Sequence, residues 1–120
     1  MSFHWDLYVQ LADELIRYQR QKHLMEAYFR SAISRSYYGA FGSARVKLEK
    51  RGINIPRQNT HEFVINEYQN SPDKKNKQIG RALLTFRRER NKADYEHSGT
   101  FDFNKARRAF LKAQQILTQL

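Results

Sequence analysis

Residues 79–97, I-G-R-A-L-L-T-F-R-R-E-R-N-K-A-D-Y-E-H, decide the fold because their apolar side chains repeat with the period of an α-helix. At about 100° per residue, one stripe holds Ile79, Ala82, Leu83, Phe86 and Ala93. Arg90 and His97 fall in the middle of the same stripe, and Asp94 falls beside it. Charged groups on a face that a helix normally buries need partners. The stretch therefore predicts either a structural ion pair or a polar site where helices meet.

Helical spacing continues through the rest of the chain, and no segment alternates as a strand does. We expect helices over about 5–18, 22–51 and 73–97, a short helix capped by Thr60, and a last helix that begins at Asp102 or Asn104. Gly52 is a natural helix stop, so residues 52–59 form the longest internal loop. The expected fold class is all-α, an antiparallel bundle of about five helices in one domain over residues 1–120, with the second and fourth helices at its centre.

The second helix is apolar or small on two sides, which predicts burial on both. Gly39 and Gly42 cost helix stability, so another backbone is expected to approach them closely. That neighbour is either another helix of this chain or the same helix of a second subunit. Arg35 and Tyr38 share this small-residue face. In the first helix, one stripe carries Leu7, Leu11, Leu15 and Tyr18.

The composition narrows the function classes. Without cysteine, the chain forms no disulfide, thiol nucleophile or zinc–thiolate site. The 22 Lys and Arg residues against 12 Asp and Glu give a net charge of +10, which favours RNA, nucleotide phosphates or an acidic protein as partner. No segment reads as a signal peptide or a membrane span, so a cytoplasmic protein is expected. Histidine spacing indicates no metal site, and no motif indicates a cofactor.

Basic residues are concentrated in one segment. Between residues 74 and 92, eight Lys and Arg residues stand against one Glu. Together with the second helix, this segment supplies the candidate RNA- or phosphate-binding residues Arg35, Arg87, Arg88 and Lys92.

Arg90, Asp94 and His97 are spaced i, i+4 and i+7, which places them along one face of a continuous helix. In a catalytic site, His97 would move protons while Arg90 holds a phosphate and stabilises its transition-state charge. Asp94 lies between them and can bond either one. Alternatively, Arg90 and Asp94 form an ion pair that braces the helix, and His97 caps its end.

Two blocks of the sequence resemble the HEPN family. Arg90-Asn91 with His97 after six intervening residues resembles its Arg/His signature. The string R-N-K-A-D-Y-E at 90–96, preceded by S-R-S-Y-Y-G-A-F at 34–41, is similar to the bacterial and archaeal HEPN branch encoded beside a minimal nucleotidyltransferase. The likeness covers roughly residues 22–120. In the commoner form of the signature the His follows four intervening residues, where this chain has Tyr95.

The resemblance implies a HEPN-type ribonuclease toxin of a toxin–antitoxin or antiviral defence system, which cleaves RNA without metal. Its catalytic residues would be Arg90, His97 and Asp94, with Tyr38 and Asn91 in support, in a cleft formed by a homodimer. The antitoxin would be a minimal nucleotidyltransferase, and Tyr95 is the nearest match to the tyrosine that such enzymes modify.

Two other functions stay open. Tyr95 at the commoner His position favours a catalytically silent HEPN module that binds RNA or a nucleotide, or that partners a nucleotidyltransferase. In a third interpretation, the basic helix only docks an acidic partner protein. Separately, Arg35 either lies beside the candidate cleft or forms a structural pair with a carboxylate such as Asp94 or Glu89. The position of His97 separates the first two: within reach of Arg90 it favours the enzyme, and facing solvent it favours the binding module.

Overall fold

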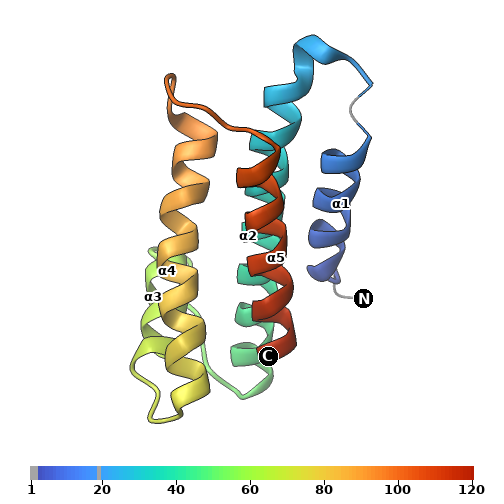
Figure 1. Cartoon of the computed structure of the whole chain (residues 1–120). Coiled ribbons are helices and arrows are strands. Elements are labelled where there is room, and N and C mark those ends of the chain that lie inside the picture. The colour runs from blue at the N-terminus through green and yellow to red at the C-terminus, as the bar shows by residue number, and fades with distance from the viewer. Residues whose placement is uncertain (1–2, 19) are drawn as a thin grey trace.

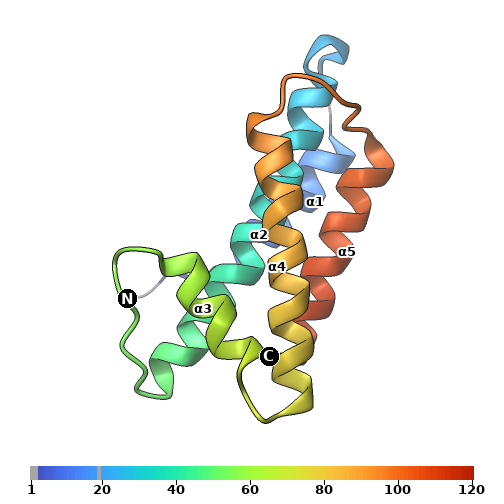
Figure 2. The ribbon, with the colours of Figure 1, turned by 90° about the vertical axis from the view of Figure 1, so that its left-hand side faces the viewer.

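A computed structural model of the chain describes residues 3–18 and 20–120. Its α-helices are α1 (Asp6–Arg17), α2 (Met25–Lys50), α3 (Thr60–Gln69), α4 (Lys74–Tyr95) and α5 (Phe103–Gln119), with a short 3₁₀ turn at Lys22–Leu24. No strand forms in the described ranges, so the predicted all-α fold class is confirmed. The helices α1, α2, α4 and α5 alternate in direction (Figure 1), while α3 and α5 flank α4 on opposite sides (Figure 2).

The central helix is α2, which contacts α1, α3, α4 and α5. Tyr37 and Phe86 are fully buried where α2 and α4 run antiparallel, and their rings meet edge to face with centroids 5.5 Å apart. The prediction that these two long helices run antiparallel in the bundle is therefore confirmed.

Two glycines let α1 approach α2 closely. A Cβ on Gly39 would overlap the Val9 side chain and lie 3.1 Å from the Val9 nitrogen, and a Cβ on Gly42 would overlap the Trp5 indole. The predicted close approach is confirmed, and the neighbour is α1 of the same chain. A second subunit therefore cannot pack against these glycines, and the homodimer stays a prediction without this face to support it.

The helix α1 buries a different stripe from the one noted in the sequence. Val9, Ala12 and Ile16 are buried, whereas Leu7 and Leu11 are largely exposed. Both stripes are apolar, and the glycine face of α2 selects the one that contains Val9. Leu15, from the stripe noted in the sequence, is partly buried and packs against the core.

The connection over residues 51–59 is the longest between helices, as predicted. Gly52 has φ +85°, and its N–H donates to the carbonyl of Glu49 while the N–H of Ile53 donates to that of Leu48. These two bonds form a Schellman motif, the stop expected of a glycine after a helix.

Side-chain caps begin two helices. Asp73 and Asp102 accept hydrogen bonds from the backbone N–H groups of Lys75 and Lys105, which confirms the predicted starts of α4 and α5. The predicted cap of α3 is wrong. Asn59 occupies the N-cap position and makes no side-chain cap bond, and the hydroxyl of Thr60 donates to carbonyls of the preceding loop instead of capping the helix.

Candidate RNA-binding site

The helix α4 ends at Tyr95, and His97 lies in the following loop with an exposed side chain. Glu96, the C-cap, has extended dihedral angles of φ −76° and ψ 131°. The predicted stack of Arg90, Asp94 and His97 on one continuous helix is therefore wrong for His97. Within the described part of the chain, the imidazole of His97 has no hydrogen bond and no ion pair.

A contact from α2 ends α4 early. The Nη1 group of Arg30 donates to the carbonyls of Ala93 at 3.0 Å and Glu96 at 2.7 Å. These are carbonyls that a helix end leaves without intrahelical donors. Phe101 is buried with its ring centroid 4.0 Å from the Arg30 guanidinium, so the chain turns back toward the core instead of extending the helix.

Arg90 and Asp94 form an ion pair at the interface of α4 with α2. Arg90 is 6% exposed, and its Nη1 lies 3.6 Å from Oδ2 of Asp94. The same carboxylate oxygen accepts a hydrogen bond from the Ser34 hydroxyl at 3.3 Å. The ion pair left open by the sequence is thus present, at the long end of the distance range for such pairs.

The guanidinium of Arg90 also faces aromatic rings. Its carbon lies 5.1 Å from the ring centroids of both Tyr37 and Tyr38, within the range of cation–π attraction. Its Nε is buried and has no hydrogen-bond partner among the described residues. A buried cation is therefore held by one carboxylate and two rings.

Arg35 is half-buried and lies between two tyrosine rings. Its guanidinium carbon is 4.7 Å from the ring centroid of Tyr8 on α1 and 5.1 Å from that of Tyr38. No carboxylate of the described residues forms an ion pair with it, so the predicted pair with Asp94 or Glu89 is absent. We call Tyr8, Arg35, Tyr37, Tyr38 and Arg90 the arginine–tyrosine cluster.

A cavity of about 480 Å³, which we call the arginine pocket, adjoins the cluster through Tyr38. The N-cap residue of α1, together with residues from α2, the 51–59 connection, α3 and α4, lines it; among the lining residues are Trp5, Tyr38, Arg45, Arg57, His61 and Arg87. No Asp or Glu is among the lining residues. The pocket therefore holds three guanidinium groups and no carboxylate.

His61 lies in this pocket, and the positive charges there contribute to the lowering of its pKa. Burial, and then the charges of Arg87 and Arg90, lower its pKa to about 4, so the imidazole is neutral at pH 7. Its Nδ1 lies 2.7 Å from the Tyr37 hydroxyl, and its ring stacks on Phe41 with centroids 4.1 Å apart. Donation from the Tyr37 hydroxyl to Nδ1 satisfies that hydroxyl and leaves Nε2–H as a hydrogen-bond donor.

The structure separates the remaining predicted site residues. Arg87 lines the arginine pocket, and Asn91 is exposed one turn further along α4. Lys92 instead lines a second pocket between α4 and α5, and Arg88, one turn before it, is exposed. Tyr95 is 72% exposed.

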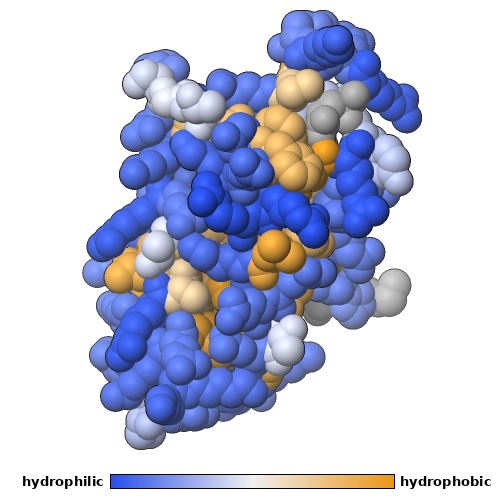
Figure 3. All heavy atoms as spheres, viewed as in Figure 1, coloured by the Kyte–Doolittle hydropathy of each residue, from blue (hydrophilic) through white to orange (hydrophobic). Residues whose placement is uncertain are grey.

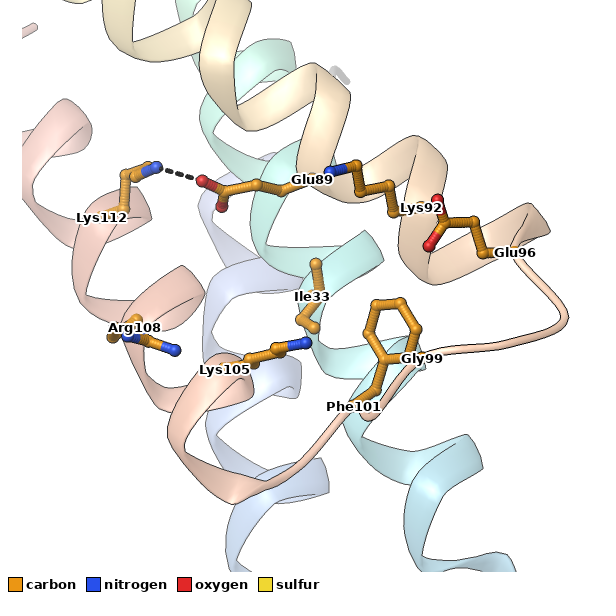
Figure 4. A pocket seen from close by; sticks show the side chains of 9 residues that line it. All are labelled: Ile33, Glu89, Lys92, Glu96, Gly99, Phe101, Lys105, Arg108 and Lys112. Carbon is orange, nitrogen blue, oxygen red and sulfur yellow. Dashed lines mark hydrogen bonds and ion pairs between the residues drawn. The ribbon is translucent and has the colours of Figure 1, made fainter.

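The second pocket, of about 450 Å³, contains charges of both signs (Figure 4). Its lining includes Lys92, Lys105, Arg108 and Lys112 together with Glu89 and Glu96. Lys112 and Glu89 form an ion pair of 2.8 Å within it. It belongs to the α5 side of the molecule, whose surface is mostly hydrophilic with scattered apolar atoms (Figure 3). Its cations are therefore partly neutralised by carboxylates of its own lining, whereas the lining of the arginine pocket contains no carboxylate.

Sequence reasoning missed Tyr8, Arg45, Arg57 and His61. They come from four segments whose spacing in the sequence carries no common period.

Two further properties hold for residues 3–18 and 20–120: no helix has the length and apolar content needed to cross a bilayer, and no three or more His, Asp or Glu side chains are grouped to hold a metal ion.

The chain was compared with protein-family models, with curated proteins and with solved structures, and none of them matches it.

Proposed function

We propose that this protein is a HEPN-like RNA-binding module that holds a single strand at the arginine–tyrosine cluster. One observation carries the proposal: Arg35 is half-buried between the rings of Tyr8 and Tyr38 and has no carboxylate partner among the described residues. A half-buried guanidinium without a counterion keeps hydrogen-bond donors and a positive charge that an anionic ligand can use. An RNA phosphate would supply the missing charge.

The side chains of the cluster suit a single strand of RNA. A guanidinium binds phosphate oxygens through two parallel hydrogen bonds, which a lysine cannot reproduce. Tyrosine rings beside it can stack on unpaired bases, the usual mode of single-strand recognition. The net charge of +10 favours association with any polyanion, so specificity rests on the cluster itself.

The resemblance noted in the sequence agrees with this location. Arg35 and Tyr38 belong to the block at 34–41, and Arg90 and Asp94 belong to the block at 90–96. Asp94 bonds Ser34, so the two blocks are in contact.

A HEPN-type ribonuclease toxin is the second candidate. The observation that favours it is His97, an exposed imidazole without a bond in the described residues, seven positions after Arg90. An RNA strand lying on the cluster would have to meet this loop for His97 to act as a general acid or base. The binding module is preferred because the Arg90–Asp94 pair is complete without His97.

The partners expected from the sequence, a minimal nucleotidyltransferase and a second copy of the chain, are also proposals. A minimal nucleotidyltransferase would find the Tyr95 hydroxyl accessible, since that side chain is 72% exposed. Copurification tests such a partner, and light scattering at tens of micromolar tests the homodimer. A cytoplasmic location likewise stays a prediction.

Fluorescence anisotropy with a 3′-labelled single-stranded RNA tests the binding module. We expect Arg35→Ala to weaken binding about tenfold, or about 1.4 kcal/mol. Arg35→Lys keeps the charge and should recover only part of this loss, because the planar fork is missing. Arg107→Ala, an exposed arginine of α5, is the matched control and should change affinity less than about twofold.

Equal losses in Arg35→Ala and Arg107→Ala would mean that only net charge attracts RNA, and the proposal would fail. The ribonuclease candidate is tested separately by cleavage of the same RNA. Cleavage that is abolished by His97→Ala, with affinity unchanged, would replace the binding module by the enzyme.

A further inference from the structure

The arginine pocket carries more positive charge than its own surroundings neutralise. Arg57 and Arg87 have no ion pair among the described residues, and the Nε of Arg87 is buried without a hydrogen-bond partner. Arg45 pairs with Glu49 at 3.6 Å, but both side chains are about half exposed, and such a pair is weak. Two guanidinium groups in the pocket are thus available to an anion, and a third is loosely held.

Further hydrogen-bond donors meet at the same place. The first turn of α3 begins at Thr60, and Asn59, its N-cap residue, makes no side-chain bond to the free N–H groups of that turn. The hydroxyl of Thr60 is committed to the carbonyls of Pro56 and Arg57 at 2.8 and 3.1 Å. Since Thr60 and His61 line the pocket, uncapped helix amides lie at its edge beside the arginines.

We propose that the arginine pocket is a subsite for a terminal phosphate, a phosphomonoester dianion, at the end of an RNA strand or on a mononucleotide. For the RNA source, the inference rests on the proposed function, because the pocket adjoins the arginine–tyrosine cluster through Tyr38. A strand whose bases stack at the cluster would place its end in the pocket.

A terminal phosphate fits this site better than a phosphate within a strand. A monoester carries a charge of about −1.5 to −2 at pH 7 and has three free oxygens, whereas a diester has one charge and two free oxygens. Three guanidinium groups without a lining carboxylate match the higher charge. The lining also includes the partly exposed rings of Trp5 and Tyr38, which offer apolar contact to the attached nucleoside.

The test uses three unlabelled RNAs of one sequence: with a 5′-phosphate, with a 3′-phosphate and with neither. Each competes against the labelled strand, and adenosine 5′-monophosphate and adenosine are compared by calorimetry. We expect one of the phosphorylated strands to bind about tenfold more tightly than the unphosphorylated strand. Adenosine monophosphate should bind more tightly than adenosine by a similar factor.

Arg57→Ala should bring these ratios close to one. Arg57 is exposed in the 51–59 connection, so its removal is not expected to affect folding. Arg87→Lys is the second variant, because it keeps the charge while removing the fork and the buried Nε. Arg81→Ala, an exposed arginine of α4 outside the pocket, is the matched control and should leave the ratios unchanged.

A second readout does not depend on RNA. An anion bound in the pocket favours the imidazolium form, so sulfate, which is still a dianion at pH 4, should raise the pKa of His61, followed by NMR, above its value of about 4. Chloride at equal ionic strength should raise it less.

The outcomes separate the inference from the proposed function. If the unphosphorylated RNA binds and no probe shows a phosphate preference, the subsite is refuted while RNA binding stands. If no RNA binds but adenosine monophosphate binds in an Arg57-dependent manner, RNA binding is refuted and the phosphate subsite stands for a nucleotide. If no probe binds and the pKa of His61 does not respond to sulfate, both fail.

Discussion

Removing the carboxylate of the Arg90–Asp94 pair should cost more stability than removing its cation. In Asp94→Asn, Arg90 stays charged at 6% exposure and loses the one carboxylate that pairs with it among the described residues. Breaking a fully buried pair costs about 3–5 kcal/mol, but here the pair is 3.6 Å long and the Asp94 side chain is 25% exposed. The rings of Tyr37 and Tyr38 still face the cation, each contributing about 0.5–1 kcal/mol. We therefore expect a loss of about 2 kcal/mol.

Arg90→Met should cost less. Methionine fills most of the space of the arginine arm, and Asp94 keeps its bond from Ser34 and its access to water. The buried Nε without a partner disappears at the same time. The expected loss is about 1 kcal/mol, with the double variant close to the Arg90→Met value.

Urea denaturation followed by circular dichroism at 222 nm measures these free energies of unfolding for the wild type and the three variants. The m-values must agree for the comparison to be valid. If Arg90→Met is as destabilising as Asp94→Asn, or more so, the interpretation of Arg90 as a buried cation that depends on Asp94 is wrong.

Three further outcomes are expected elsewhere in the fold. Gly80→Ala should lower thermal stability by about 1–3 kcal/mol despite its better helix propensity, because the new Cβ would lie 2.6 Å from the backbone nitrogen of Gln69; an unchanged melting temperature would refute this. The pKa of His61 is about 4 in the folded chain and 6.5 when unfolded, so the unfolded state binds the proton first and stability should decline as the pH falls from 6.5 to 4. After solvent screening this amounts to about 1 kcal/mol, and His61→Gln should flatten the slope in pH-dependent urea titrations; an equal slope in both proteins would contradict the assignment. Arg30→Ala should speed amide hydrogen exchange in the last turn of α4, because the carbonyls of residues 93 and 96 lose their donor and Phe101 loses the nearer of the two cations over its ring; exchange unchanged there would argue against this account of the helix end.

The parts of the fold that depend on local signals could be predicted from the sequence. Asp73 and Asp102 accept bonds from N–H groups two and three residues ahead, and Gly52 ends α2 through its own positive φ. Each of these signals lies within a few residues of the boundary that it sets. The helix boundaries that depend on these signals could therefore be predicted from the sequence.

The end of α4 and the buried face of α1 depend on distant residues. Arg30 lies 63 positions before Ala93, whose carbonyl it binds. No local sequence pattern therefore indicates that α4 ends at Tyr95. In α1 both stripes are apolar, and only the close approach at Gly39 selects Val9 over Leu7. Tertiary packing therefore determines both the end of α4 and the buried face of α1.

The candidate site was predictable in part for the same reason. The helices α2 and α4 run antiparallel and in contact. This contact brings Arg35 and Tyr38 of α2 close to Arg90 and Asp94 of α4. The arginine pocket draws on Trp5, Arg57 and His61, which come from the N-terminal end, a loop and the start of a short helix. Nothing in their spacing relates them, and the fold alone makes them neighbours.

Mapping RNA contacts by NMR tests the RNA-binding claim most directly. A ¹⁵N-labelled sample, with arginine Nε–H signals assigned, would be titrated with the unlabelled single-stranded RNA. We expect the largest chemical-shift changes at Arg35 and at the backbone of Tyr38. Lys105 and Arg108, in the second pocket between α4 and α5, should change little. Shifts centred on Lys105 and Arg108, or spread evenly over all basic residues, would contradict a binding site at the arginine–tyrosine cluster.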